Sequence, residues 1–133
     1  MSSTFSTWFV PAALALGLSG CIFVPTDGDD LGTLQFEWTI LGDDDPSDCR
    51  ITGSDRLELA VYDIFGDNVT TLYPYCDNFD VTLALDDGFY SAELTLVDRF
   101  NESVTRTQIL DDLDVIEDST LEVSIDFGVR DFL

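Results

Sequence analysis

Apolar residues recur at every second position through most of this chain. Between Thr33 and Ile40 the apolar positions are Leu34, Phe36, Trp38 and Ile40, and the positions between them are polar. Side chains alternate between two faces along a β-strand, so this period predicts a strand with one buried face. The same alternation returns in four later stretches: Leu57–Val61, Phe79–Leu85, Tyr90–Leu96 and Leu121–Phe127. No strong amphipathic helix accompanies them, and the chain is therefore predicted to be all-β.

Turn signals separate these stretches at short spacing. Phe65-Gly66-Asp67-Asn68 predicts a turn that closes a hairpin into a strand at Val69–Tyr75. Asp86-Asp87-Gly88 predicts a tighter turn, and with it the clearest hairpin of the chain, between the apolar stretches on either side. Both turns favour strands that pair with their neighbours in sequence.

The remaining part of the chain completes the predicted fold. Val104–Ile109 adds another strand, whereas Leu110–Asp118 fits either one helical turn or a further short strand. About seven short strands with turns at this spacing predict an antiparallel β-sandwich of immunoglobulin-like or transthyretin-like type.

The N-terminal segment carries an export signal. Trp8–Leu18 is an apolar run of signal-peptide length that is too short for a comfortable membrane span. It ends in Leu18-Ser19-Gly20-Cys21, which resembles the lipobox of bacterial lipoproteins. The resemblance implies cleavage before Cys21, acylation of that cysteine and a lipid anchor. In such lipoproteins Asp after the cysteine favours the inner membrane, so Ile22 implies the outer membrane.

One feature departs from the lipoprotein pattern. Residues 1–7 lack the basic side chains that normally precede the apolar run. Two alternatives therefore stay open: an ordinary signal peptide with a cysteine near its end, or a buried N-terminal strand. With the lipobox, the predicted organisation is a signal peptide at residues 1–20, an acidic flexible tether at 21–32 and a sandwich domain at 33–133.

The charge of the chain excludes several classes of function. Five Arg residues and no Lys or His stand against 27 acidic residues, for a net charge of −22. A field of this sign repels nucleic acid, so no nucleic-acid partner is expected. The absence of His and Lys removes the usual general base, Schiff-base lysine and commonest transition-metal ligand. We therefore expect neither catalysis nor a cofactor. The same acidity, with no Lys, also resembles proteins adapted to high salt.

The cysteine count predicts a disulfide. If Cys21 carries lipid, Cys49 and Cys76 remain, and an even remainder in an oxidising compartment favours a bond between them. Closing this loop would stabilise the fold by roughly 3 to 4 kcal/mol on the chain-entropy model. The alternative is a redox or metal-binding thiol pair, although the sequence offers neither CxxC spacing nor His.

A short motif adds a resemblance at the level of fold. Gly88-Phe89-Tyr90, with Leu94 and Leu96 behind it, resembles the Gly-x-Tyr strand start of carboxypeptidase-regulatory-like and collagen-adhesin B-type domains. The whole layout is similar to small single-sandwich lipoproteins of Gram-negative bacteria. Adhesin-type domains often carry an isopeptide that needs Lys, which this chain lacks, so the resemblance implies a fold and no chemistry.

An acidic segment is the sharpest candidate for a ligand site. Asp43, Asp44, Asp45 and Asp48 precede Cys49, and oxygen ligands gathered on a loop suit Ca²⁺. The acidic residues do not match the spacing of an EF-hand loop. Chance clustering in an acidic chain explains the segment equally simply as a solvated loop, so no metal site is assigned.

Aromatic residues form a second candidate. Trp38 and Tyr73-Pro74-Tyr75 would form a sugar-stacking platform if they were exposed. Trp38 is in phase with the apolar face of its strand, which predicts a core position instead. Tyr73 and Tyr75 stay open between packing and a surface patch.

These observations predict a lipid-anchored protein of the cell envelope that acts as an interaction or structural module without catalysis. Its expected partners are the membrane, through the anchor, and an envelope protein or glycan. The alternative is a surface module that binds Ca²⁺ or carbohydrate.

Overall fold

The structure is a computed structural model that describes residues 21–23 and 30–133. The predicted signal peptide at residues 1–20 lies outside the described residues, and so does 24–29 within the predicted tether. For Cys21–Phe23 the backbone alone is described.

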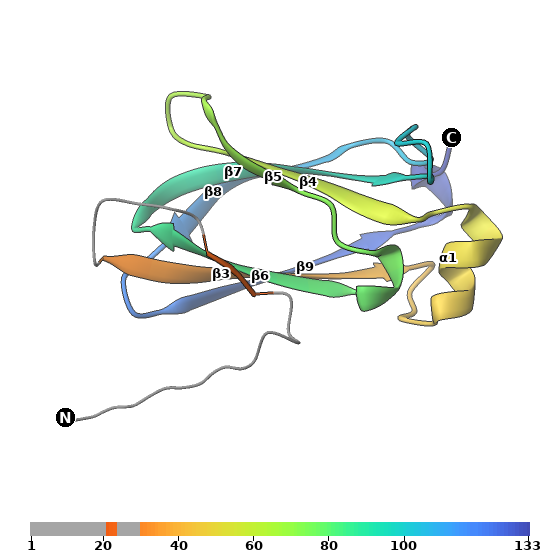
Figure 1. The fold of residues 1–133 in the computed structure, drawn as a ribbon, viewed down its shortest axis with the longest axis horizontal. Helices are drawn as coiled ribbons and strands as arrows, with labels where there is room; N and C mark the ends of the chain where they lie inside the picture. Colours follow the sequence, from red (N-terminus) through yellow and green to blue (C-terminus); the bar gives the residue numbers. More distant parts are fainter. Residues whose placement is uncertain (1–20, 24–29) are drawn as a thin grey trace.

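Two sheets packed face to face form the molecule (Figure 1). One sheet has the strand order β2-β6-β3-β9 and the other β5-β4-β7-β8. This confirms the predicted all-β sandwich, and the described residues hold eight strands. The strands are β2 (Cys21–Phe23), β3 (Leu31–Ile40), β4 (Arg56–Tyr62), β5 (Asn68–Leu72), β6 (Asp80–Asp86), β7 (Gly88–Val97), β8 (Gln108–Val115) and β9 (Thr120–Phe127). The short helices are α1 (Pro46–Thr52), η1 (Cys76–Asn78) and η2 (Val129–Asp131).

The pairing is antiparallel in one sheet and mixed in the other. All pairs of the β5-β4-β7-β8 sheet are antiparallel. In the second sheet β3 pairs antiparallel with β6 but parallel with β9, and β2 pairs parallel with β6. An alternating pattern specifies a buried face and carries no information about the direction of the partner strand.

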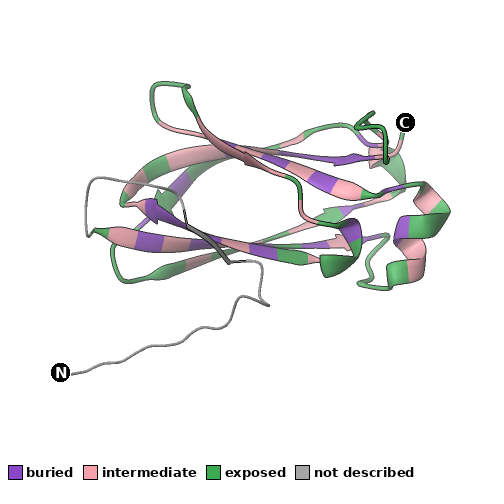
Figure 2. Cartoon of the chain, viewed as in Figure 1, coloured by how far each residue is buried: buried purple, intermediate pink, exposed green. Residues whose placement is uncertain are grey.

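The core lies between the two sheets, as Figure 2 shows. Alternation along β3 is confirmed, because Leu34, Phe36, Trp38 and Ile40 are all buried while the residues between them are not. Each such side chain stabilises the fold by about 1.5–3 kcal/mol relative to an exposed one. The other sheet supplies the facing residues Leu57, Leu59, Val61, Ala92, Leu94 and Leu96.

The first predicted hairpin is confirmed. Strands β4 and β5 pair antiparallel around a turn in which Asp63 Oδ1 accepts hydrogen bonds from the backbone N–H groups of Phe65 and Asp67, at 2.9 and 3.0 Å. Gly66 has a backbone φ of 82°. Residues other than glycine adopt this conformation only at a cost in free energy. Strand β5 ends at Leu72, whereas the predicted strand continues to Tyr75.

The hairpin predicted around Asp86-Asp87-Gly88 is wrong. Strands β6 and β7 are consecutive, but β6 pairs with β3 and β7 pairs with β4 in the opposite sheet. The chain therefore crosses between the sheets at this point. Gly88 has a φ of 151°, and the Tyr90 hydroxyl donates to the Asp86 carbonyl at 2.8 Å across the bend. A hairpin and such a crossing have the same alternating strands and the same turn residues, so the pattern does not separate them.

The C-terminal strands differ in detail from the prediction. Strand β8 begins at Gln108 and runs to Val115, so the expected strand at Val104–Ile109 starts too early. The open segment Leu110–Asp118 is strand as far as Val115 and then a turn. Alternation in β9 is confirmed, although the side chains of this strand facing the core are half-buried until Phe127. Strand β9 lies at a sheet edge, which explains its partial cover.

Candidate functional site

The acidic segment at residues 43–48 is not a simple loop. Asp45 caps the N-terminus of α1, where its Oδ1 accepts a hydrogen bond from the backbone N–H of Ser47 at 2.9 Å. This bond lowers the pKa of the Asp45 carboxyl. Asp48 lies in the helix itself, and Gly53 ends it with a φ of 76°. The expected solvated loop is thus a turn, a cap and a helix, because Asp followed by Pro is a strong helix start.

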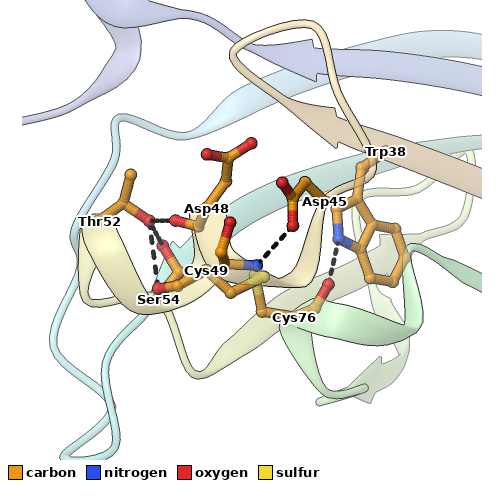
Figure 3. Close-up of a disulfide and its surroundings, with 8 residues drawn as sticks. Trp38, Asp45, Asp48, Cys49, Thr52, Ser54 and Cys76 are labelled. Atoms are coloured by element: carbon orange, nitrogen blue, oxygen red, sulfur yellow. Dashed lines mark hydrogen bonds between the residues drawn. A yellow bond between two sulfur atoms is a disulfide. The ribbon is translucent and has the colours of Figure 1, made fainter.

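The predicted disulfide is confirmed. Cys49 in α1 bonds to Cys76 in η1, with their Cα atoms 6.1 Å apart, and both side chains are buried (Figure 3). The bond closes a separation of 27 residues, which corresponds to about 3.5 kcal/mol on the chain-entropy model. Trp38 Nε1 donates to the Cys76 carbonyl oxygen at 3.0 Å. The indole is 1% exposed, so its predicted core position is also confirmed.

An open cleft lies beside this disulfide. It has a volume of about 570 Å³, and three segments form it: α1, the turn that follows α1, and the loop between β7 and β8. A second hollow of about 310 Å³ shares Val104 with it. The residues of the cleft are Cys49, Arg50, Gly53, Ser54, Asp55, Asp98, Arg99, Phe100 and Val104, and we call it the Arg50–Arg99 cleft.

The loop after β7 presents an aromatic side chain at the rim of this cleft. Asp98 Oδ1 accepts hydrogen bonds from the backbone N–H groups of Phe100 and Glu102, at 2.8 and 2.9 Å. Asn101 has a φ of 64°, which tightens the turn. Phe100 is 69% exposed as a result, and the Arg99 guanidinium lies over its ring, 4.9 Å from the centroid. The cation and the aromatic ring thus lie together at the surface of the cleft.

All five arginines lie at the end of the sandwich that carries α1. Arg50 lies in α1, Arg56 begins β4, Arg99 and Arg106 lie between β7 and β8, and Arg130 lies in η2. The pairing of Arg56 with Val97 places the start of β4 beside the end of β7, and the end of β9 lies beside that of β3. Residues 21–23 and 30–133 contain a single ion pair, between Arg56 Nε and Asp55 at 3.5 Å.

The opposite end of the sandwich carries acidic residues and no arginine. It is formed by the start of β3, the β4–β5 turn, the β6–β7 crossing and the β8–β9 turn. In the sequence the five arginines are confined to a few segments. Only the strand order shows that these segments lie at the same end of the sandwich. The acidic residues at this end are Asp30, Asp63, Asp67, Asp86, Asp87, Asp111, Asp112, Asp114, Glu117 and Asp118.

Tyr73 and Tyr75 form a surface patch. They are 41% and 53% exposed and lie beyond the end of β5. The Tyr73 hydroxyl donates to Glu58 Oε2 at 3.0 Å, and this bond with the carboxylate raises the pKa of the phenol. The Arg56 guanidinium covers the Tyr75 ring at 4.4 Å. The question left open by the sequence is thus decided in favour of the surface.

Two further features are absent from the described part of the chain. Across residues 21–23 and 30–133, no three His, Cys, Asp or Glu side chains come together in a group suited to a metal ion. Among the helices of the same residues, none has the length and apolar character needed to cross a bilayer.

Comparison with known proteins yields a weak structural likeness. No family model and no curated protein matches the chain. Among solved structures, a leucine-rich repeat protein from Bacteroides thetaiotaomicron VPI-5482 aligns with 16% identity and a TM-score of 0.48. The alignment covers 75% of this chain and 12% of that one, so this chain spans a small part of its length. A likeness this weak supports no argument about fold or function.

Proposed function

We propose that this protein is a lipid-anchored component of the cell envelope whose sandwich is a non-catalytic interaction or structural module. The lipobox sequence ending at Cys21 supports the anchor and an outer-membrane address. The disulfide supports an oxidising compartment, because such bonds are rare where thiols are kept reduced. The absence of His and Lys supports a role without catalysis.

The Arg50–Arg99 cleft is the observation that favours an interaction module. Arginine and aromatic residues are enriched in protein interfaces and supply most of their binding energy, whereas Asp and Glu are depleted there. In a chain with 27 acidic residues, Arg50, Arg99 and exposed Phe100 share one cleft, in which Asp55 and Asp98 are the acidic residues. The cleft is also built on a rigid base, since a disulfide holds its helix.

The anchor is tested by the intact mass of the protein from a bacterial membrane fraction. The proposal predicts a chain that starts at Cys21 and carries acyl groups, and reduction should add two hydrogens at Cys49 and Cys76. The Cys21→Ser variant should lose the acyl mass and leave the membrane fraction. An unacylated, soluble wild-type protein would contradict the proposed address.

The interaction role is tested by photo-crosslinking in intact cells. A photoreactive phenylalanine analogue is placed at Phe100 in the cleft or, as matched control, at Phe89 at the opposite end, which is also exposed. A discrete adduct from position 100 that is absent from position 89 supports the module. Equal labelling from both positions, or turnover of envelope polymers by the purified protein, would reject it.

A carbohydrate-binding module is the second candidate. The exposed pair Tyr73 and Tyr75 favours it, because aromatic rings at a surface present faces on which sugars stack. The alternative stated from the sequence also includes Ca²⁺ binding. Titration calorimetry with envelope glycans and with Ca²⁺ therefore tests both ligands. Heat with glycans that disappears in a Tyr73→Ala, Tyr75→Ala variant would support it, and no heat with either ligand would remove it.

A further inference from the structure

Two of the five arginines line the cleft. Neither Arg50 nor Arg99 forms an ion pair with any residue in 21–23 or 30–133. Two carboxylates share the lining: Asp98 Oδ1 accepts two backbone hydrogen bonds of its own loop, and Asp55 pairs with Arg56. Arg50 is also close enough to Asp45 to contribute to the lowered pKa of that carboxyl. At physiological ionic strength charges more than about 8 Å apart are largely screened, so the distant carboxylates of the chain act on a bound anion less than the charges of the lining do.

The cleft also offers space for an apolar side chain. Val104 lines both the cleft and the second hollow, where Phe132 and Leu133 add apolar surface. The two volumes, about 570 and 310 Å³, match the size of small ligand pockets. Guanidinium groups beside an apolar hollow suit a ligand that carries an anion and an apolar group a few ångströms apart.

A buried hydroxyl in the lining adds a third feature. Ser54 is 6% exposed, and its Oγ lies 2.9 Å from Thr52 Oγ1 (Figure 3). The single hydroxyl proton of Thr52 is directed at the Asp48 carbonyl oxygen, 2.7 Å away. Ser54 is therefore the donor in the pair, and its oxygen keeps its capacity to accept a hydrogen bond. An N–H group is the complementary partner.

From these three features we infer that the Arg50–Arg99 cleft binds an acidic, extended peptide segment of a partner protein. Arg50 and Arg99 bind an Asp or Glu carboxylate, which matches the planar guanidinium fork. A neighbouring apolar side chain of the segment lies over Val104 and Phe132, and a peptide N–H donates to Ser54. Free phosphate lacks both the N–H donor and the apolar group. The inference rests on the proposed interaction role and specifies its ligand.

A peptide-binding assay with the purified, detergent-solubilised full protein tests this assignment. The probe is Gly-Phe-Asp-Glu-Phe-Gly labelled with a neutral dye, followed by fluorescence anisotropy in 0.15 M salt. The matched probe carries Asn-Gln in place of Asp-Glu. We expect the acidic probe to bind at least tenfold more tightly than the amide probe. Equal binding of the two, or no binding of the acidic probe, would overturn the inference.

Variants locate the binding. The double variant Arg50→Gln, Arg99→Gln should weaken binding of the acidic probe at least tenfold, while Arg106→Gln, at the same end but outside the cleft, should leave it unchanged. The circular dichroism spectrum of the double variant should match that of the wild type, which shows that any loss of binding does not come from unfolding. Retained binding in the double variant, or loss of binding in Arg106→Gln, would contradict the assignment.

Two further outcomes separate this inference from the proposed function. If an uronic-acid oligosaccharide binds the cleft and the acidic peptide does not, the ligand class is wrong. If crosslinking at Phe100 finds a partner while the acidic probe fails to bind, the interaction module stands and the acidic-segment assignment falls. Failure of the anchor test bears on the proposed address and leaves the peptide measurement unaffected.

Discussion

Trp38 shows how a single residue connects the core to the disulfide. Its side chain lies on the buried face of β3, as the alternation of apolar and polar residues predicts. The indole N–H, which would otherwise be a buried donor without an acceptor, bonds to the carbonyl of Cys76 from a different segment. The sequence predicts the burial but not this partner, because 38 residues separate the two.

Replacing Trp38 by Phe should destabilise the fold by about 2 kcal/mol, because it removes core volume and weakens the hydrogen bonding of a buried carbonyl. Chemical denaturation measures the change in the free energy of unfolding. Phe36→Leu is the control, since it removes volume from the same face without a hydrogen bond. A loss for Trp38→Phe no larger than that of the control would show that the indole bond contributes nothing.

Glu117 illustrates the electrostatic cost of the acidic end. The nearby carboxylate of Asp30 raises the pKa of Glu117, and Asp118 and Asp87 add to this effect. A carboxyl with a raised pKa in the folded state binds its proton more tightly there than in the unfolded chain. The free energy of unfolding therefore falls as pH rises from the ordinary Glu pKa through the raised one.

Glu117→Gln should raise the thermal midpoint at pH 7 and low ionic strength, because it removes a carboxylate from this repulsive cluster. The gain should vanish below the ordinary Glu pKa, where the wild-type carboxyl is protonated, and shrink in about 1 M salt, where the Debye length is near 3 Å. Thermal melts across pH and salt measure it. Glu122→Gln removes the same charge from the middle of β9, and an equal gain there would show that only net charge matters.

Among the elements, β6 and β7 show what an alternating pattern leaves undetermined. Both strands were predicted with nearly their observed bounds, yet they belong to opposite sheets. Strand β6 pairs with β3, whose partner residues lie 43 to 55 positions earlier in the chain, and β7 pairs with β4. Pairing over such distances depends on which buried faces meet in three dimensions, and adjacent turn residues do not encode it.

The start of β3 provides a sharp test of close packing between elements. Strand β3 begins at Leu31, so Gly32 lies in the sheet and not at the end of a tether. A Cβ atom at Gly32 would collide with the carbonyl oxygen of Ile116 and lie 2.7 Å from Cγ1 of Val115. The β8–β9 turn thus approaches the β3 backbone more closely than any side chain permits.

Gly32→Ala should therefore destabilise the fold by about 2 kcal/mol or more, because the backbone of the turn has to move. The change is read as the shift of the midpoint in denaturant. Gly128→Ala is the matched control, since its added Cβ would meet other atoms at an ordinary 3.7 Å. Equal stability of the two variants would mean that the contact between β3 and the turn is loose.

At the scale of the whole molecule, the two ends of the sandwich differ in charge. The ten residues of β3 span about 33 Å, and this length separates the arginines from the end that carries acidic residues only. Without Lys, the 27 acidic side chains repel one another in the folded state more than in the expanded unfolded chain. Repulsion among these carboxylates therefore destabilises the folded state at low salt.

Stability should accordingly rise with salt. We expect the thermal midpoint to increase steadily between about 0.01 and 1 M NaCl as the Debye length falls from about 30 to 3 Å. Circular dichroism melts measure it, and CaCl₂ at equal ionic strength separates screening from specific Ca²⁺ binding. A midpoint that is flat in NaCl would contradict the screening argument, and an additional rise in CaCl₂ alone would favour a cation site.

The sequence by itself determined most of the strands, their buried faces and the Cys49–Cys76 bond. Strand and face follow from a period of two within a few residues, and the bond follows from counting cysteines. Only the tertiary structure decided which strands share a sheet, the parallel pairing of β3 with β9, and the cleft that joins Arg50 to Arg99. These features depend on contacts between segments tens of residues apart, and the free energy that selects them comes from burying all the faces at once.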